Sequence, residues 1–439
     1  MLKEVTCLVL FFFFLLPTKN TFNFPLLTSS STAIHHSDSD SYAVVFDAGS
    51  TGSRVHVFAF QPNLDLTPIH QSYEFFLSIS PGLSSYEHDP DAAALSLKPL
   101  LQSAEAVVPA ELRAQTPVRL GATAGLRLLP GNASEAILDA VRKLLKTESK
   151  LYYRPDWVSV LGGIDEGGGN QLFIGSLGKS YWSTVGIVDL GGGSVQMAYA
   201  ISEAAAAAAP PTADGEDPYV SDKVALGTKY HLYAHSYLNY GLKAARALSL
   251  KLSGNKGNPC ITNGYQGTYE YSDVVYKVSP PMYGTSRRRC RLLTRKVLGL
   301  DAPCSHRNCS FNGVWNGGGG DGRKNLYVAS FFYDTAAETG IIEPNAPGAN
   351  VRPIQYLKAA KRACTANVDN INSIFPLIDK RDVPFLCMDL VYEYMLLVDG
   401  FGVDPLQEIT VLKEVNYKGS LIGAAWPLGC AVELVSSLK

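Results

Sequence analysis

The sequence predicts an α/β protein built from two related lobes, and two observations carry this prediction. The first is a loop that occurs twice, as Asp-Ala-Gly-Ser-Thr-Gly-Ser-Arg at residues 47–54 and as Asp-Leu-Gly-Gly-Gly-Ser at residues 189–194. The second is an alternation of strand-like and helix-like patterns that begins at residue 42. Because a repeated loop indicates two similar halves, we expect the function to lie in the cleft between them.

Each of the two loops follows an apolar run that is typical of a buried strand, at residues 42–46 and 185–188. After the first loop, alternating Val55, Val57 and Ala59 predict the second strand of a hairpin. Glycines let backbone N–H groups approach an anion, and hydroxyl groups add further donors. An aspartate at the end of each strand can hold a divalent cation or its waters. Two such loops facing each other would clamp a polyphosphate and its metal.

A single Asp-x-Gly string is more often an ordinary tight turn, but two copies that both follow strands and both carry hydroxyl residues favour the phosphate site. The loops do not end in Gly-Lys-Ser/Thr, so they are not Walker loops. They also lack a Gly-x-Gly-x-x-Gly that opens a helix, which excludes a dinucleotide-binding fingerprint.

The remaining patterns predict further elements in chain order. We expect helices over the following residues: 92–106, 133–146, 231–252, 383–398 and 420–435. We expect strands at these: 118–121, 157–161 and 408–412. Two segments are predicted to be loops, namely the alanine-rich, then proline-containing and acidic residues 204–217 and the glycine-rich residues 312–322.

Composition excludes some function classes. The 439 residues are enough for two or three domains, and with 46% hydrophobic and 18% charged residues the chain can bury a core. The formal net charge is −2, and the basic residues are scattered apart from one run at 287–291. We therefore expect no binding of DNA or RNA.

The N-terminus resembles a secretory leader. Lys3 precedes an apolar stretch at residues 7–16, which Pro17 ends and which is short for a membrane span. A cleaved signal peptide and an uncleaved signal anchor both fit this pattern. Residues 20–41 are rich in Ser, Thr and Asp and are expected to be disordered.

Cysteine usage also points to the secretory pathway. Seven of the eight cysteines follow residue 259, and none has Cys-x-x-Cys spacing, which argues against a zinc site. Sequential pairing gives three bridges and leaves Cys430 free, although sequence alone cannot prove a connectivity. The expected pairs are Cys260–Cys290, Cys304–Cys309 and Cys364–Cys387. Two glycosylation sequons begin at Asn132 and Asn308.

Three further strings accompany the two loops. They are Gly-Ala-Thr-Ala-Gly-Leu-Arg at 121–127, Gly-Gly-Ile-Asp-Glu-Gly at 162–167 and Ala-Trp-Pro-Leu-Gly at 425–429. Together, in this order, the five strings resemble the signature regions of the apyrases, the nucleoside triphosphate diphosphohydrolases. The resemblance covers residues 42–439 and is greatest to the plant members of the family.

The resemblance implies an actin-like fold of two RNase H-like lobes. It implies Ca²⁺- or Mg²⁺-dependent hydrolysis of nucleoside tri- and diphosphates, such as ATP and ADP, to the monophosphate. In the domain division that we expect, residues 42–180 form the first lobe and residues 181–419 form the second, disulfide-stabilised lobe. Residues 1–41 are the leader and linker, and residues 420–439 return to the first lobe.

The resemblance also assigns roles to residues. Glu166 would be the base that activates water, Gln196 would position that water, and Asp47, Asp189 and Trp426 would hold the metal through waters. Phe332 and Tyr333 would stack on the nucleobase. The expected nucleotide- and phosphate-binding residues are Ser50, Thr51, Gly52, Ser53, Arg54, Thr123, Arg127, Gly191, Gly192, Gly193, Ser194 and Gln196. Taken one at a time, Glu166, Arg127 and Trp426 would more often be a surface carboxylate, a structural ion pair and a core residue.

One departure from the family pattern keeps an alternative open. After Glu166 the chain continues Gly-Gly-Gly-Asn-Gln-Leu-Phe-Ile at 167–174, several residues shorter than the family and without its aromatic residues. Glycines start a helix poorly, so the segment that holds Glu166 is expected to be short or displaced. The alternative is therefore a nucleotide- or carbohydrate-binding protein with impaired turnover. A sugar kinase or chaperone ATPase of the same superfold is a second competitor, although the strings around Thr123, Glu166 and Trp426 do not resemble those proteins.

Partners and location follow from these expectations. We expect a monomer that binds nucleotides and no nucleic acid, with membrane attachment only through an N-terminal anchor. A cleaved leader places the protein outside the cell, and a retained anchor places it in the Golgi lumen.

Overall fold

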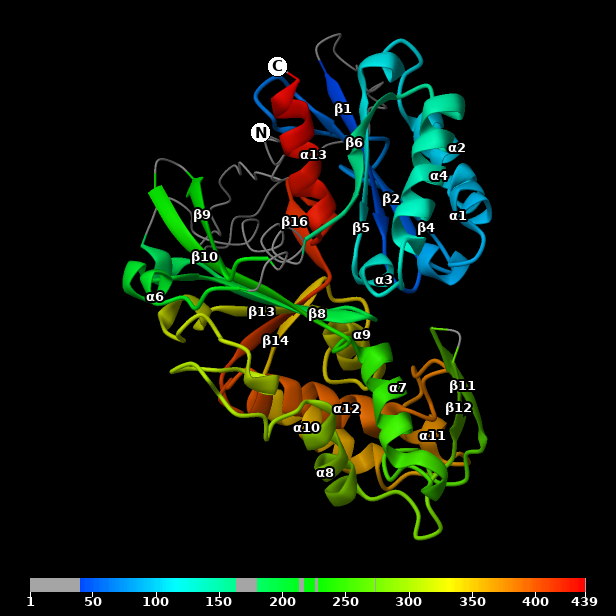
Figure 1. The fold of residues 1–439 in the computed structure, drawn as a ribbon, viewed down its shortest axis with the longest axis vertical. Coiled ribbons are helices and arrows are strands. Elements are labelled where there is room, and N and C mark those ends of the chain that lie inside the picture. The colour runs from blue at the N-terminus through cyan, green and yellow to red at the C-terminus, as the bar shows by residue number, and fades with distance from the viewer. Residues whose placement is uncertain (1–39, 163–179, 213–216, 226–227, 273, 439) are drawn as a thin grey trace, which may run out of the picture.

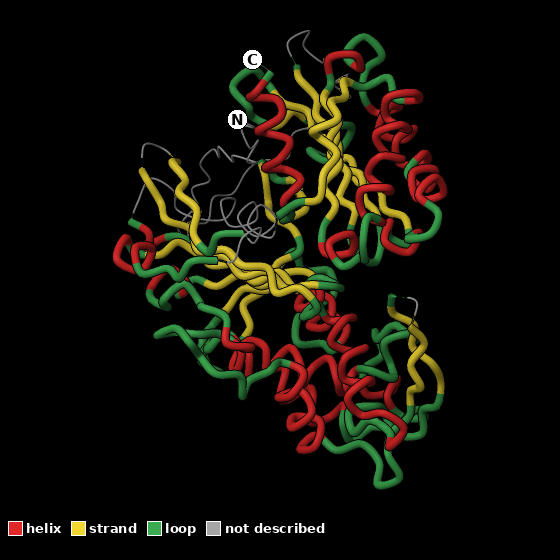
Figure 2. The backbone as a smooth tube through the Cα atoms, in the orientation of Figure 1, coloured by secondary structure: helices red, strands yellow, loops and turns green. Residues whose placement is uncertain are grey.

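The computed structural model describes residues 40–162, 180–212, 217–225, 228–272 and 274–438. Two sheets, each covered by helices, dominate the described chain (Figures 1 and 2). We call the first sheet with its helices lobe I and the second sheet with its helices lobe II. Short helical turns connect many elements: η1 (Leu83–Tyr86), η2 (Arg113–Gln115), η3 (Tyr181–Ser183), η4 (Gly254–Lys256), η5 (Phe311–Gly313), η6 (Asp321–Arg323) and the π-turn η7 (Leu396–Gly400).

The lobe I sheet has the strand order β3-β2-β1-β5-β6, with β4 paired to β2. Its strands are β1 (Ser41–Ala48), β2 (Ser53–Phe60), β3 (Leu66–Thr67), β4 (Phe75–Ile79), β5 (Pro117–Ala122) and β6 (Tyr152–Val160). Its helices are α1 (Pro90–Ser96), α2 (Lys98–Val107), α3 (Ala124–Arg127), α4 (Ala133–Glu148) and the C-terminal α13 (Trp426–Ser437).

Both faces of β1 are buried because side chains alternate along a strand. Val44 and Phe46 pack with α1, α2 and α4 in one core cluster. Ala43 and Val45 pack with α13 in another, so α13 lies along β1 on the opposite face of the sheet (Figure 1). The end of the chain therefore completes the core that its first strand begins.

The lobe II sheet has the order β14-β15-β13-β7-β8-β10-β9. Its strands are β7 (Gly186–Leu190), β8 (Ser194–Ile201), β9 (Val220–Ala225), β10 (Thr228–Leu238), β13 (Leu326–Ser330), β14 (Gly348–Val351) and β15 (Ile409–Leu412). Two hairpins stand apart from the main sheets: β11 (Gly267–Tyr271) with β12 (Val274–Val278), and β16 (Glu414–Tyr417) with β17 (Ser420–Gly423). The helices of this part of the chain are α6 (Glu203–Ala207), α7 (Leu242–Ser253), α8 (Arg287–Val297), α9 (Phe331–Glu338), α10 (Pro353–Ala363), α11 (Ile371–Ile374) and α12 (Leu386–Met395).

Most predicted elements are confirmed, but the long helix predicted over residues 231–252 is wrong. Its first part is β10, which pairs with β8 on one side and with β9 on the other. Tyr230, Tyr233 and Tyr237 are three and four residues apart, which imitates one face of a helix, yet tyrosine also favours strands. Gly241 separates the strand from α7.

Other boundaries shift for local reasons. The helix predicted over 420–435 begins only at Trp426, because residues 420–423 form β17, and Pro427 is tolerated in the first helical turn. The helix predicted over 92–106 is divided at Leu97 into α1 and α2. Residues 203–207 form the short helix α6 within a segment predicted to be a loop.

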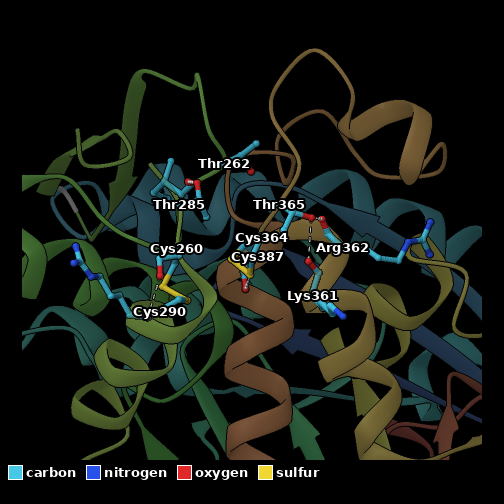
Figure 3. Close-up of a disulfide and its surroundings, with 12 residues drawn as sticks. Cys260, Thr262, Thr285, Cys290, Lys361, Arg362, Cys364, Thr365 and Cys387 are labelled. Atoms are coloured by element: carbon cyan, nitrogen blue, oxygen red, sulfur yellow. Dashed lines mark hydrogen bonds between the residues drawn. A yellow bond between two sulfur atoms is a disulfide. The ribbon is translucent and has the colours of Figure 1, made fainter. Parts of the chain in front are cut away.

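The three predicted disulfides are confirmed, and Cys430 is free and buried. Figure 3 shows two of them, with Cys290 on α8 joined to Cys260 and Cys387 on α12 joined to Cys364, directly after α10. These bridges fix α8, α10 and α12 against neighbouring segments of lobe II. None of the helices in the described ranges is long and apolar enough to cross a membrane.

Peptide mapping of the purified protein under non-reducing conditions should find these three pairs and a free thiol at Cys430. Because a bridge restricts the unfolded chain, replacing both Cys364 and Cys387 by serine should lower the free energy of unfolding by about 2–4 kcal/mol. The Cys430→Ser variant controls for loss of a thiol without loss of a bridge. Seven free thiols in the native protein would contradict the pairing.

Candidate active site

A cavity of about 480 Å³ lies between the two lobes, a size that suits a small-molecule ligand. Both repeated loops contribute to it. From lobe I and the segment that leads into α13 it is lined by Asp47, Gly49, Ser50, Thr51, Arg54, His56, Ser72, Glu74, Phe76, Thr123, Ala124, Leu421, Gly423, Ala424, Ala425 and Trp426. From lobe II it is lined by Asp189, Gly191, Gly192, Gly193, Ser194, Gln196, Ala329, Ser330, Phe331, Tyr333, Asp334, Leu412, Lys413 and Glu414.

The two loops are the turns of two equivalent hairpins. In the first hairpin Asp47 on β1 pairs with Arg54 on β2, and in the second Asp189 on β7 pairs with Gln196 on β8. In each hairpin the aspartate also lies beside a parallel strand, β5 in lobe I and β13 in lobe II. The structure thus places an acidic side chain and a hydrogen-bond donor at the same register position of both lobes.

The first loop holds Asp47 in a mostly buried position, with 15% of its side chain exposed. The Nη1 of Arg54 donates to its Oδ2 at 3.1 Å. The other oxygen, Oδ1, is buried and has no hydrogen-bond partner among the described residues. Since a buried carboxylate oxygen without a donor is costly, this atom suits a cation or a cation-bound water.

The glycine carbonyl groups of the second loop are all hydrogen-bonded to the segment that leads into α7. The oxygens of Gly191, Gly192 and Gly193 all accept hydrogen bonds from amides of residues 239–244. Engaged carbonyls repel a phosphate less, which favours anion binding by the same loop.

The loops meet at positions where a side chain would not fit. A Cβ added to Gly192 would lie 2.7 Å from Ser50 Oγ and from Thr51 Cγ2 of the other lobe. A Cβ on Gly125 would lie 2.8 Å from Ser50 Cα. Gly192 therefore permits the close approach of the two lobes, and Gly125 permits the close packing of α3 against the first loop within lobe I.

Asp189 and Gln196 are held by hydroxyl groups. Ser330 Oγ donates to Asp189 Oδ1 at 2.6 Å. The Nε2 of Gln196 donates to Ser194 Oγ and, at 3.0 Å, to Ser236 Oγ. Ser330 has a φ of 60°, which is rare for a residue other than glycine. Such strain of about 1–3 kcal/mol is often found at functional sites.

Not every predicted binding residue reaches the cavity. Thr123 does, beside the first loop, where its amide donates to Ala48 O at 3.0 Å. Gly52, Ser53 and Arg127 are absent from the described lining, and Ser53 is buried with 1% of its surface exposed. Within the first loop, the carbonyl oxygen of Gly52 accepts from the amide of Gly49 at 3.0 Å.

Of the two residues predicted to stack on the nucleobase, Phe332 and Tyr333, only Tyr333 lines the cavity. Phe332 is fully buried in the lobe II core, where Tyr356 donates to its carbonyl oxygen, so the structure does not bring Phe332 to the cavity. Phe331 and Tyr333 do line it. Tyr333 is 4% exposed, and its hydroxyl donates to Ala346 O at 2.6 Å. The side chains of Phe331 and Phe332 leave the helix about 100° apart, so Phe331 can line the cavity while Phe332 is buried in the core.

Trp426 reaches the cavity from the first turn of α13 and packs over β5. A Cβ on Gly121 would lie 2.6 Å from Trp426 Cη2, so this glycine makes room for the indole. Glu166 lies outside the described residues, as do residues 163–179 generally.

Buried charges stabilise the helices beneath the second loop. Arg246 on α7 donates from Nε and Nη2 to both oxygens of Asp389 on α12, at 2.9 and 2.6 Å, and contacts Asp382 at 2.7 Å. Burial raises the pKa of Asp389 to about 6, while the Arg246 guanidinium lowers it, so the pair is ionised at neutral pH. Burial also lowers the pKa of Lys243, whose Nζ lies 5.9 Å from the ring centroid of Phe331.

Within the described ranges, no group of three or more His, Cys, Asp or Glu side chains could hold a metal ion. Each of the two repeated loops nevertheless contributes one carboxylate, Asp47 or Asp189, to the same cavity. Such a donor set fits a hard divalent cation that keeps most of its waters and is bound through substrate phosphates as well.

Sequence reasoning did not find Ser330, His56 or Glu74, and it included Phe331 only as the first residue of the aromatic run 331–333. Ser330 meets Asp189 only because β13 pairs in parallel with β7, and no local pattern indicates that pairing. His56 could have been found, since it follows Arg54 by two residues and so shares a face of the strand.

The family model and the relatives that match this chain agree with one another. Residues 33–439 match the model of the GDA1/CD39 (nucleoside phosphatase) family. The chain is 56% identical over 404 residues to "Apyrase" of Solanum tuberosum, which covers 91% of this chain and 89% of that protein. It is 49% identical over 420 residues to "Nucleoside-triphosphatase" of Pisum sativum, which covers 94% and 92%.

A crystal structure of nucleoside triphosphate hydrolases from Neospora caninum is similar with a TM-score of 0.60 at 15% identity, covering 91% of this chain and 93% of that one. At this identity the likeness concerns the fold alone. It confirms the predicted actin-like α/β fold of two lobes.

Proposed function

The chain belongs to the GDA1/CD39 (nucleoside phosphatase) family, and we propose that it is an apyrase that hydrolyses nucleoside tri- and diphosphates to the monophosphate and phosphate. One observation carries this most strongly. The two equivalent hairpins place Asp47 with Arg54 and Asp189 with Gln196 around one interlobe cavity. Identity to nucleotide hydrolases over about nine tenths of the chain disfavours a protein that binds nucleotides without turnover.

In this hydrolysis the residues of the site would have separate roles. Ser50, Thr51 and Arg54 would bind the terminal phosphates from lobe I, and Gly191–Ser194 would bind them from lobe II. Gln196 would position the attacking water, and Glu166 would accept its proton. Phosphoryl transfer depends mainly on such positioning and on neutralising charge.

A divalent cation, Ca²⁺ or Mg²⁺, would supply charge neutralisation at the phosphates when bound. Asp47 and Asp189 would hold it through waters, and Trp426 would border its water shell. The orphaned Oδ1 of Asp47 supports this assignment.

Phosphate release from ATP and from ADP, measured with Ca²⁺ or Mg²⁺ and then with chelator, tests the proposal. Release from both nucleotides, abolished by chelator, would support it. Nucleotide binding without release would favour the binding protein, and transfer of phosphate to a sugar would favour the kinase.

Replacing Asp47 or Asp189 by alanine should raise the divalent-cation concentration for half-maximal activity by about ten- to hundredfold, as loss of a group that orients a metal typically does. Asp156→Ala, which changes an exposed carboxylate on β6, is the matched control. An unchanged cation dependence in both site variants would remove these aspartates from the metal site.

We also propose passage through the secretory pathway, with export or retention in the Golgi lumen depending on the leader. The three bridges support an oxidising compartment. Asn132 and Asn308 are both exposed, which leaves them accessible to glycosylation. Enzymatic deglycosylation followed by mass measurement, and N-terminal sequencing, test these points.

A further inference from the structure

The chain returns from lobe II to lobe I through the β16–β17 hairpin, which is tied to a different lobe at each end (Figure 1). At its start the amides of Lys413 and Glu414 donate to Pro347 O at 2.9 and 3.0 Å, in lobe II. At its end the amide of Gly423 donates to Glu74 Oε2 at 2.8 Å, in lobe I. The carboxylate of Glu74 is thus the lobe I attachment closest to α13.

Glu74 is itself held by His56 on β2. Its Oε1 lies 2.6 Å from His56 Nδ1, and only 8% of the Glu74 side chain and 5% of the His56 side chain are exposed. A carboxylate oxygen accepts, so the tautomer of His56 with its proton on Nδ1 donates to it. A buried hydrogen bond of this kind is costly to break because it leaves a buried polar group without a partner, which makes this a firm attachment.

This attachment lies in the wall of the nucleotide cavity. Glu74, His56 and Gly423 all line it. His56 follows Arg54 by two residues on β2 and therefore shares its face of the sheet. Gly423 precedes Trp426 by three residues, so a shift of the hairpin end would move the indole as well.

The hairpin also contacts lobe I through Ile422, which is buried in the core cluster of β1 and α13, and through two polar contacts near its turn. Tyr417 Oη accepts from the amide of Leu66 at 3.0 Å, and Lys418 Nζ contacts Asp65 Oδ2 at 3.4 Å in an exposed ion pair. An exposed pair of this kind contributes little to stability because water screens it. The Lys418–Asp65 pair is therefore a weak contact of the same hairpin, which can be compared with the buried contact between Glu74 and Gly423.

We propose that Glu74, oriented by His56, is a positioning residue for the hydrolytic reaction. It fixes the end of the returning hairpin to lobe I and so sets Trp426, and the adjoining cavity wall, relative to the phosphate loops. The proposal rests on the proposed function, because positioning matters only if the cavity performs chemistry. Glu74 does not take part in bond making.

A positioning role predicts that loss of Glu74 lowers kcat while nucleotide affinity changes little. Glu74→Ala removes the acceptor of Gly423 and His56, so it should lower kcat by about tenfold or more, since a displacement of about 1 Å can cost a hundredfold. The affinity for a non-hydrolysable ATP analogue should change less than threefold, because the loop donors remain. Glu74→Gln keeps an oxygen for Gly423, and its amide can donate to the other tautomer of His56, so kcat should return to within threefold of the parent.

The experiment measures kcat, KM, analogue affinity by calorimetry and amide hydrogen exchange of the peptide spanning residues 420–426. The parent, Glu74→Ala, Glu74→Gln and the control Lys418→Ala are compared. Faster exchange and a lower kcat in Glu74→Ala alone would support the proposal. A kcat within twofold of the parent in Glu74→Ala would overturn it, as would an equal loss in Glu74→Gln.

The experiment also gives a result if Glu74→Ala does not fold or if the parent protein is inactive. If Glu74→Ala does not fold, His56→Ala is measured instead, because it removes the donor that orients Glu74. Its loss of kcat should be rescued by His56→Asn, whose Nδ2 can donate to the same oxygen. An unchanged kcat in His56→Ala, or no rescue by His56→Asn, would overturn the proposal. If the parent itself releases no phosphate, the proposed function fails and the positioning role fails with it. If the parent releases phosphate and Glu74→Ala has the same kcat, only the positioning role is excluded, and the proposed function stands.

Discussion

Glu166→Gln is expected to lower nucleotide turnover by about a hundredfold or more and to leave nucleotide affinity nearly unchanged. The amide cannot accept the proton of the attacking water, which is the contribution of a general base. It has the same size as the carboxylate, so the phosphate contacts from the two loops should persist. Single-turnover phosphate release and analogue binding measure the two quantities separately.

Glu111→Gln is the matched control, because Glu111 is an exposed carboxylate of lobe I outside the cavity lining. Its turnover should equal that of the parent. A Glu166→Gln protein that hydrolyses ATP at the parental rate would exclude Glu166 as the base and would direct attention to the acidic cavity residues Glu414 and Asp334.

Gly192→Ala should reduce kcat by about ten- to hundredfold with little loss of stability. The added Cβ would lie 2.7 Å from Ser50 Oγ and Thr51 Cγ2, so either the lobes move apart or these two side chains rotate. Both responses displace groups that would bind phosphate, and such displacements are costly to catalysis. Steady-state kinetics and thermal unfolding of the variant check the two parts of this expectation.

Gly191→Ala is the control within the same loop. Its Cβ would approach only Ser194 O, at 3.3 Å, and no atom of lobe I within 4 Å. We expect it to retain more than a third of the parental kcat. Equal losses in both variants would show that the loop backbone, and not the contact between lobes, limits activity.

Local signals in the sequence were enough to predict much of this molecule. The two loops, their strands and the first hairpin depend on short-range patterns of glycine and alternating residues, and all are present. Sequential cysteine pairing also succeeded, since each pair joins segments close in the chain.

The errors arose where distant segments decide the outcome. β10 is a strand because β8 and β9 flank it, although its tyrosines have helical spacing. Phe332 is buried by distant segments of the lobe II core, and Phe331 lines the cavity instead. Ser330 and Glu74 act on residues 141 and 349 positions away, and no local pattern can indicate such contacts. The role of Glu166 and the domain boundaries stay predictions.

The position of α13 has a consequence for biosynthesis. Ala43 and Val45 of β1 are covered by a helix that begins at Trp426, so one face of the first sheet has no cover until the end of the chain is made. At about 5–20 residues per second, the delay between these segments is roughly 20–80 seconds. During that interval the nascent chain presents an apolar sheet face to its surroundings, and premature termination before α13 should yield a product that aggregates rather than a smaller enzyme.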